Sequence, residues 1–133
     1  MKKIEQTAHV SVKVYLNLAV LLIWSLPVFG FAAESPPLAG EQLFRNNCMA
    51  CHQSSGQGIQ GIYPSLADSE VVSGNADDVA LVVLIGRGDM PSFRGSLNAA
   101  DLAAIINYVR NAWGNSGAMI SADRVVQLAA TVD

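Results

Sequence analysis

The chain has 133 residues, which is enough for one domain of ordinary size, and carries eight Lys and Arg residues against eleven Asp and Glu residues. All three lysines lie in the first 13 residues, so from residue 33 onward five scattered arginines stand against ten carboxylates, a net charge of −5. This composition argues against a nucleic-acid partner, because neutralising phosphates requires clustered cations. It also excludes docking through a ring of lysines.

The N-terminal 32 residues have the pattern of an export signal. The lysines precede an uncharged run over residues 14–33 that is rich in Leu, Val, Ile and Phe and ends in small residues. Cleavage after Ala32 places Gly30 and Ala32 in the small-residue positions. We therefore expect a signal peptide over 1–32 and a periplasmic domain over 33–133. The alternative is an uncleaved membrane anchor, since about 20 uncharged residues can just span a bilayer.

A first short helix is predicted over residues 40–47, directly before the pentapeptide Cys48-Met49-Ala50-Cys51-His52. Two thiols three positions apart, followed at once by a histidine, form the attachment site of a c-type haem. Each cysteine can add across a haem vinyl group to form a thioether, and the turn between them presents the imidazole to the iron. We therefore predict one covalently bound haem c, attached through Cys48 and Cys51, with His52 as an axial iron ligand.

Alternative roles fit the same pentapeptide less well. A structural zinc site requires four Cys or His ligands, and from residue 33 onward the sequence offers three. A thioredoxin-like dithiol follows a strand, whereas residues 43–47 before the motif are neither uniformly apolar nor β-branched. A simple disulfide between the two cysteines is a further, weaker alternative.

Two other motif matches lack the context that their usual functions require. Residues 56–61 fit the pattern GxGxxG but do not follow an apolar strand, so a dinucleotide site is not expected. We expect these glycines to let the backbone turn closely past the haem edge, because Gly accepts positive φ. Residues 87–89 spell Arg-Gly-Asp, which is more simply a tight turn.

A second helix is predicted over residues 75–85. Asn75 is its expected N-cap, Asp78 stands at the reciprocal position of a capping box, and Gly86 ends it. The face expected to be buried carries Val79, Val82 and Ile85.

The third predicted helix has the clearest pattern. Asn98 caps it, Asp101 stands at the reciprocal capping position, and Gly114 is the expected stop. A last short helix is predicted over 121–130, with Val125, Val126 and Leu128 directed inward. No strand candidate of comparable quality is present, so we predict an all-α fold. The third helix has apolar residues at helical spacing, namely Leu102, Ile105, Ile106, Val109 and Trp113.

Several segments in order resemble the class I c-type cytochromes. The matching residues are Gly40 and Phe44 before the pentapeptide, then 63–66, 90–93 and 103–110. The resemblance implies a cytochrome c fold, in which three main helices and shorter ones wrap around one haem. Within this class the chain is most similar to the small haem domains that serve bacterial periplasmic dehydrogenases and reductases.

The resemblance also implies specific contacts. The first and last long helices should cross, with Gly40 permitting close approach and Phe44 packing near Ile105 and Tyr108. His52 should bind the iron through one ring nitrogen. Its other ring nitrogen should donate a hydrogen bond to the backbone carbonyl of Pro64.

Met90 is the predicted second axial ligand. From residue 33 onward there is one histidine, so two histidine ligands from one chain are excluded. Met49 lies inside the attachment turn and cannot reach the opposite haem face, which leaves Met90 and Met119. Met90 precedes Pro91, which keeps its loop extended, whereas Met119 is expected to fill the core. The family also places its ligand methionine before a proline.

Iron with one histidine and one methionine ligand transfers single electrons and binds no substrate, and we find no convincing catalytic triad or carboxylate pair. We therefore expect an electron-transfer protein that shuttles between periplasmic redox partners, a donor dehydrogenase and an acceptor oxidase or reductase. A fixed cytochrome subunit of a multisubunit dehydrogenase or reductase is the alternative. A haem sensor or peroxidase would require an open sixth site. Arg87 or Arg94 could pair with a haem propionate.

Overall fold

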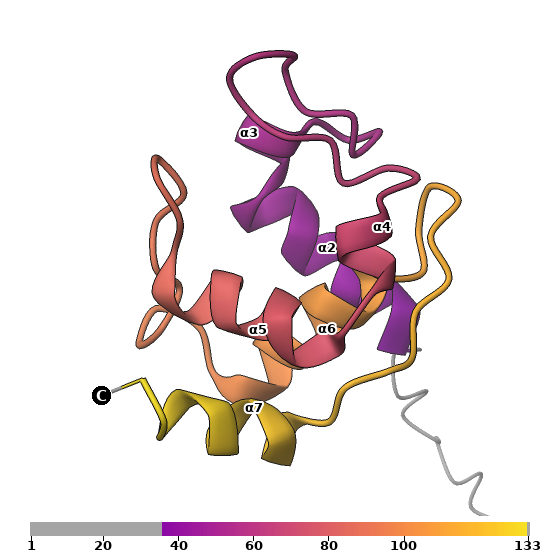
Figure 1. Ribbon diagram of the computed structural model, residues 1–133. Helices are drawn as coiled ribbons and strands as arrows, with labels where there is room; N and C mark the ends of the chain where they lie inside the picture. Colours follow the sequence, from indigo (N-terminus) through magenta and orange to yellow (C-terminus); the bar gives the residue numbers. More distant parts are fainter. Residues whose placement is uncertain (1–35, 133) are drawn as a thin grey trace, which may run out of the picture. The chain divides into compact units, whose positions relative to one another are not determined.

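The computed structural model describes residues 36–132 (Figure 1). These residues form helices and no strand, with isolated β-bridges in the loops, and the all-α prediction is confirmed. The predicted leader, residues 1–32, and the domain boundary at residue 33 lie outside the described residues. Within residues 36–132 no helix is both long and apolar enough to cross a membrane.

The first described helix, α2 (Pro36–Asn47), begins four residues before the predicted start and crosses α6 (Ala99–Val109). Gly40 lies at the crossing, where an added Cβ would clash with the Ala104 carbonyl and lie 2.9 Å from the Tyr108 Cβ. Phe44 is buried in a cluster with Ile105, and its ring centroid lies 5.6 Å from that of Tyr108. The predicted crossing and its close approach are therefore confirmed.

The short helix α4 (Glu70–Ser73) leads into α5 (Ala76–Ile85). Asn75 caps α5 as predicted, but its side-chain oxygen accepts a hydrogen bond from the Asp77 amide. The predicted buried face is partly wrong, because Ala80 and Leu84 face the core while Ile85 is 56% exposed. From Val79 to Ile85 the helix is apolar all round, so its sequence does not distinguish one face from another.

Helix α6 begins as predicted and ends earlier. The Asn98 side chain accepts a hydrogen bond from the Asp101 amide at 2.9 Å and donates one to its carboxylate at 2.7 Å. The helix ends at Val109 instead of continuing to Trp113, and Trp113 has a positive φ of 50°. The Val109 carbonyl accepts a hydrogen bond from the side chain of Asn115, a tertiary contact that helical periodicity does not reveal.

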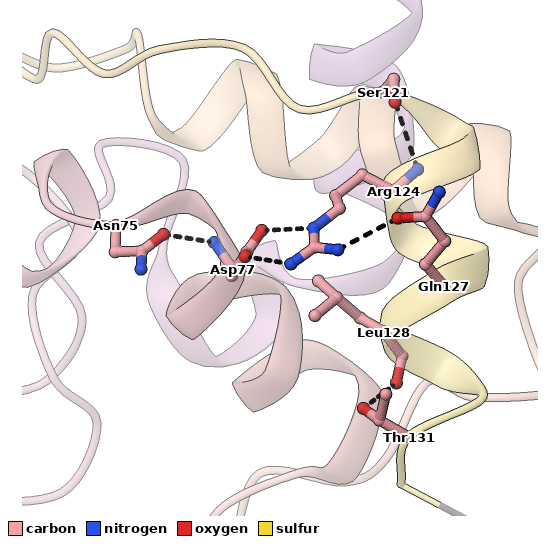
Figure 2. A network of polar contacts seen from close by, with 7 residues as sticks. All are labelled: Asn75, Asp77, Ser121, Arg124, Gln127, Leu128 and Thr131. Carbon is pink, nitrogen blue, oxygen red and sulfur yellow. Dashed lines mark hydrogen bonds and ion pairs between the residues drawn. The ribbon is translucent and has the colours of Figure 1, made fainter.

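The last helix, α7 (Ala122–Ala129), is capped by Ser121 and packs on α5 and α6. Val125 and Leu128 are buried as predicted, whereas Val126 is exposed, and its predicted inward position is wrong. Figure 2 shows how a polar network ties α7 to the first turn of α5. The Arg124 guanidinium donates to both carboxylate oxygens of Asp77, at 2.6 and 3.1 Å.

Candidate haem-binding site

The pentapeptide lies at the join of α2 and the one-turn helix α3 (Met49–His52). The Cys48 amide donates to the Phe44 carbonyl, and the Cys48 carbonyl accepts from the His52 amide, so the chain turns tightly through the motif. Cys48 and Cys51 are both free thiols and partly buried. The structure therefore contains no disulfide between these two cysteines.

Burial, and secondarily the neighbouring Cys51, raises the pKa of the Cys48 thiol to about 11. Cys48 is thus protonated at neutral pH. A thioredoxin-like dithiol requires the opposite, an attacking cysteine with a lowered pKa. The described residues also contain no group of three or more His, Cys, Asp and Glu side chains able to hold a metal ion.

The His52 ring is 8% exposed and its Nδ1 atom lies 3.1 Å from the Pro64 carbonyl oxygen. A carbonyl can only accept, so Nδ1 carries a proton, and in the neutral ring the lone pair is then on Nε2. This tautomer and the fixed ring orientation are what a histidine metal ligand requires. The predicted contact between His52 and Pro64 is confirmed.

Gly58 allows the Pro64 carbonyl to reach the histidine. Its φ is +64°, and an added Cβ would clash with the Tyr63 carbonyl and lie 2.6 Å from the Pro64 oxygen. Its amide donates to the His52 carbonyl at 3.0 Å. Gly56, Gly58 and Gly61 all have the positive φ that was expected of them.

The segment after α3 also carries exposed apolar side chains and contacts the Cys51 thiol. Ile59 and Ile62 are exposed. Next to them in the chain, the pKa of the Tyr63 hydroxyl is raised by the Cys51 sulfur, through its charge and through a hydrogen bond. A pocket of about 580 Å³ lies along residues 57–65. Its lining consists of Gln57, Gln60, Gly61, Ile62, Tyr63, Pro64 and Ser65.

Met90 lies in the loop that joins α5 to α6, where it is partly buried. Its amide donates to the Arg87 carbonyl and its carbonyl accepts from the Arg87 amide, both at 3.0 Å, so this tight turn is closed by two hydrogen bonds. Gly86 packs against the turn, because an added Cβ would lie 2.5 Å from the Met90 carbonyl oxygen. In Figure 1, α3 stands at the top of the view and this loop rises at the left.

Met119 does not fill the core as predicted, since its side chain is 63% exposed. The neighbouring Ile120 is buried instead. The reason lies in the side chain of Asn107, which donates to the Ile120 carbonyl at 2.9 Å and accepts from the Ile120 amide at 2.8 Å. These two bonds fix the direction of the segment and leave Met119 outside.

Sequence reasoning missed two buried polar residues that hold the segment after Pro64 against α6. Arg110 is 1% exposed, and its guanidinium donates to the carbonyls of Val72, Gly74 and Ala118 at 2.7 to 3.1 Å. The Asn115 side chain donates to Leu66 and accepts from the Ser69 amide. An isolated arginine or asparagine looks like a surface residue in a sequence, so no local signal identifies these roles.

The side chains present fit a covalently bound haem. Two thiols precede an imidazole whose Nδ1 is bonded to a carbonyl, which leaves Nε2 for a metal, and a thioether lies in a turn of another loop that two backbone hydrogen bonds close. Thiols that can form thioethers, together with imidazole and thioether ligands, are the donor set of haem c. Apolar side chains are exposed for contact with such a group, among them Ile59 and Ile62 after α3 and Ile85 at the end of α5.

Comparisons with known proteins agree with this donor set. Residues 35–109 match the family "Cytochrome C oxidase, cbb3-type, subunit III". Cytochrome c6 of Picosynechococcus sp. is 32% identical over 109 residues, which cover 73% of this chain and 92% of that protein. Cytochrome c-552 of Thermus thermophilus is 34% identical over 85 residues, 52% of this chain and 64% of the relative.

A larger relative is also similar. The cytochrome c subunit of a quinone-dependent alcohol dehydrogenase from Gluconobacter oxydans is 28% identical over 107 residues, 70% of this chain. This chain spans only 22% of that subunit's length. The family match covers more than half of this chain, and the alignment with cytochrome c6 covers nearly all of that protein. The chain therefore belongs to the cytochrome c family of electron-transfer proteins that carry covalently bound haem c.

Proposed function

We propose that the protein is a one-electron carrier whose haem c is attached through Cys48 and Cys51 and ligated axially by His52 and Met90. The observation that carries this proposal is the 3.1 Å contact between His52 Nδ1 and the Pro64 carbonyl oxygen, which leaves Nε2 for iron. When bound, the haem supplies a reversible ferric/ferrous couple.

The protein's own residues hold the two ligands still while the charge changes. The Pro64 carbonyl fixes the His52 ring, and the turn closed by Arg87 and Met90 fixes the backbone that carries the thioether. With both axial positions filled by side chains, water and small molecules are kept from the iron. A site of this kind suits electron transfer without substrate binding, because little rearrangement accompanies each step.

A spectroscopic experiment tests the methionine ligand. A ferric methionine-sulfur bond gives a red charge-transfer band, and we expect this band in the native protein. Met90→Ala should abolish the band and leave the haem covalently attached, whereas the matched Met119→Ala should retain both. A band that persists in Met90→Ala would exclude Met90 as the ligand.

We further propose that residues 1–32 direct export, and that the domain over 33–133 shuttles electrons in the periplasm between a dehydrogenase and an oxidase or reductase. The relatives' names include dehydrogenase cytochrome subunits and an oxidase subunit, which supports such partners. Arg45 and Arg124 are paired with Glu41 and Asp77, so docking should depend little on positive charge. A steep loss of electron-transfer rate with salt towards an acidic partner would contradict this docking mode.

A second candidate is a fixed cytochrome subunit of a larger oxidoreductase. The similarity to dehydrogenase cytochrome c subunits over 70% of this chain favours it. Purification from the native source separates the two. A monomer supports the carrier, because transient redox interfaces are small, and a stoichiometric complex supports the subunit.

A further inference from the structure

The C-terminal segment 121–132 lies beyond the family match, which ends at residue 109, yet it forms part of the core. Val125 on α7 is fully buried and packs in one cluster with Leu84 of α5 and Leu102 of α6. Leu84 is one residue before the end of α5, after which the Met90 loop begins. The segment therefore packs against the end of α5 from which the loop with the proposed ligand continues.

Polar contacts connect the same elements. Arg124 of α7 binds the Asp77 carboxylate of α5 through two hydrogen bonds, and Gln127 accepts from the same guanidinium at 3.0 Å (Figure 2). Beyond α7 the Val132 carbonyl accepts a hydrogen bond from the Arg94 guanidinium at 3.0 Å. Arg94 is four residues beyond Met90, so the tail contacts the ligand loop itself.

The loop is in turn bonded to α5. The Ser92 hydroxyl donates to the Leu84 carbonyl at 2.5 Å, and the Phe93 amide donates to the Val83 carbonyl at 3.1 Å. A displacement of α5 relative to α7 would therefore be transmitted to residues 92–93 and to the methionine beside them.

Packing between α7 and the loop is incomplete. A pocket of about 160 Å³ lies between them. Its lining includes Leu84, Arg94, Leu97, Leu102, Val125 and Val126. Since close packing does not fix the separation there, the hydrogen bond from Arg94 to the Val132 carbonyl has a larger share in setting it.

We propose that segment 121–132 is a brace that holds the Met90 loop, with Arg94 and Arg124 as positioning residues for the Met90 sulfur. The inference rests on the proposed function, because it assumes that Met90 ligates the iron. Loosening the brace increases the population in which the sulfur has left the iron. An external ligand such as imidazole then binds the ferric iron more tightly, since the binding-competent population is larger.

Imidazole titration of the haem-loaded protein tests the brace. The readout is the loss of the ferric methionine-sulfur band in the native protein, in Arg94→Gln and in Arg124→Gln. We expect the apparent Kd to fall by about two- to fivefold in each variant, the range that one exposed ion pair or hydrogen bond supports. Asp77→Asn should match Arg124→Gln, and the double variant should show little additional effect.

Arg45→Gln is the matched control, because it removes the same charge from an exposed ion pair on α2. Its imidazole Kd should equal that of the native protein. Equal Kd values in all variants would overturn the brace while leaving Met90 as the ligand. Absence of the band from the native protein would instead refute the ligation on which the inference rests.

Discussion

The Nδ1 atom of His52 donates a hydrogen bond to the Pro64 carbonyl across 3.1 Å and twelve positions of sequence. Gly58 lies against this carbonyl, and its own amide donates to the His52 backbone. The bond sets both the tautomer and the orientation of the ring, and it makes the ring more electron-rich. It therefore influences the reduction potential of the proposed haem as well as its geometry.

Gly58→Ala should raise the reduction potential. The new Cβ would lie 2.6 Å from the Pro64 oxygen, so the carbonyl must move and its bond to His52 weakens. A less electron-rich imidazole stabilises ferric iron less. A bond worth about 1 kcal/mol sets an upper limit of roughly 40 mV for one electron, because only the difference in its strength between ferric and ferrous iron changes the potential. A spectroelectrochemical titration measures the shift.

Gly61→Ala provides the control for backbone strain. Gly61 also has a positive φ, of 79°, but an added Cβ would have no atom within 4 Å. Both variants should lose about 1 to 2 kcal/mol of stability from the left-handed backbone. Only Gly58→Ala should change the potential, and an equal shift in both would show that the Pro64 contact is not the cause.

Features of the fold that depend on neighbouring residues were predictable from the sequence. Asn75 and Asn98 both cap helices as predicted, because a cap is a contact between residues two or three positions apart. The buried side of α5 was not predictable, since Leu84 and Ile85 are equally apolar and the neighbouring helices decide which is buried. The exposed Val126 was mispredicted in the same way.

The haem-attachment pentapeptide and Pro64 could be identified, because the chemistry of the motif constrains three adjacent residues and the family fixes the distance to the proline. Arg110 and Asn115 could not. Their partners lie far along the chain, with Arg110 bonded to Val72, 38 positions away, and Asn115 bonded to Leu66, 49 positions away. Such contacts depend on the completed fold.

Gly40→Ala should destabilise the protein, although alanine is usually the better helix former. Helix propensity would favour alanine by about 0.5 to 1 kcal/mol. The added Cβ, however, would clash with the Ala104 carbonyl and crowd Tyr108 at the crossing of α2 and α6. Overpacking costs about 1 to 3 kcal/mol, so a net loss is expected in guanidinium denaturation. Gln42→Ala, at an exposed position of α2, should be nearly neutral. A stabilised Gly40→Ala would mean that the helices are not in close contact.

The ion pair between Asp77 and Arg124 should make stability depend on pH. The hydrogen bond from Arg124 lowers the pKa of the Asp77 carboxyl below its ordinary value of 3.8. The ion pair therefore adds to the free energy of unfolding above about pH 4. This stabilisation is lost as the pH falls through the lowered pKa of Asp77 in the folded protein. Asp77→Asn should be less stable than the native protein at pH 7 and equal to it in strong acid.

Denaturant titrations between pH 2 and 7 measure this difference, and high salt should reduce it because the pair is exposed. Asp78→Asn is the control, since Asp78 is the exposed neighbour in the same first turn. A difference for Asp77→Asn that does not change with pH would exclude the ion pair as its source.

Replacing Arg110 should cost more stability than replacing any of the exposed arginines. Its guanidinium is buried and satisfies three backbone carbonyls, of Val72, Gly74 and Ala118. Arg110→Met keeps much of the volume but leaves these carbonyls without their donors, which should cost about 3 kcal/mol or more. Arg110→Lys retains the charge but not the planar fork of donors, so an intermediate loss is expected.

Arg45→Gln is the control and should change stability by less than about 0.5 kcal/mol. Guanidinium denaturation followed by circular dichroism ranks the stabilities of the three variants. If Arg110→Lys were as stable as the native protein, a single point charge would suffice there, and the three directed hydrogen bonds would not be what holds residues 72–74 against α6.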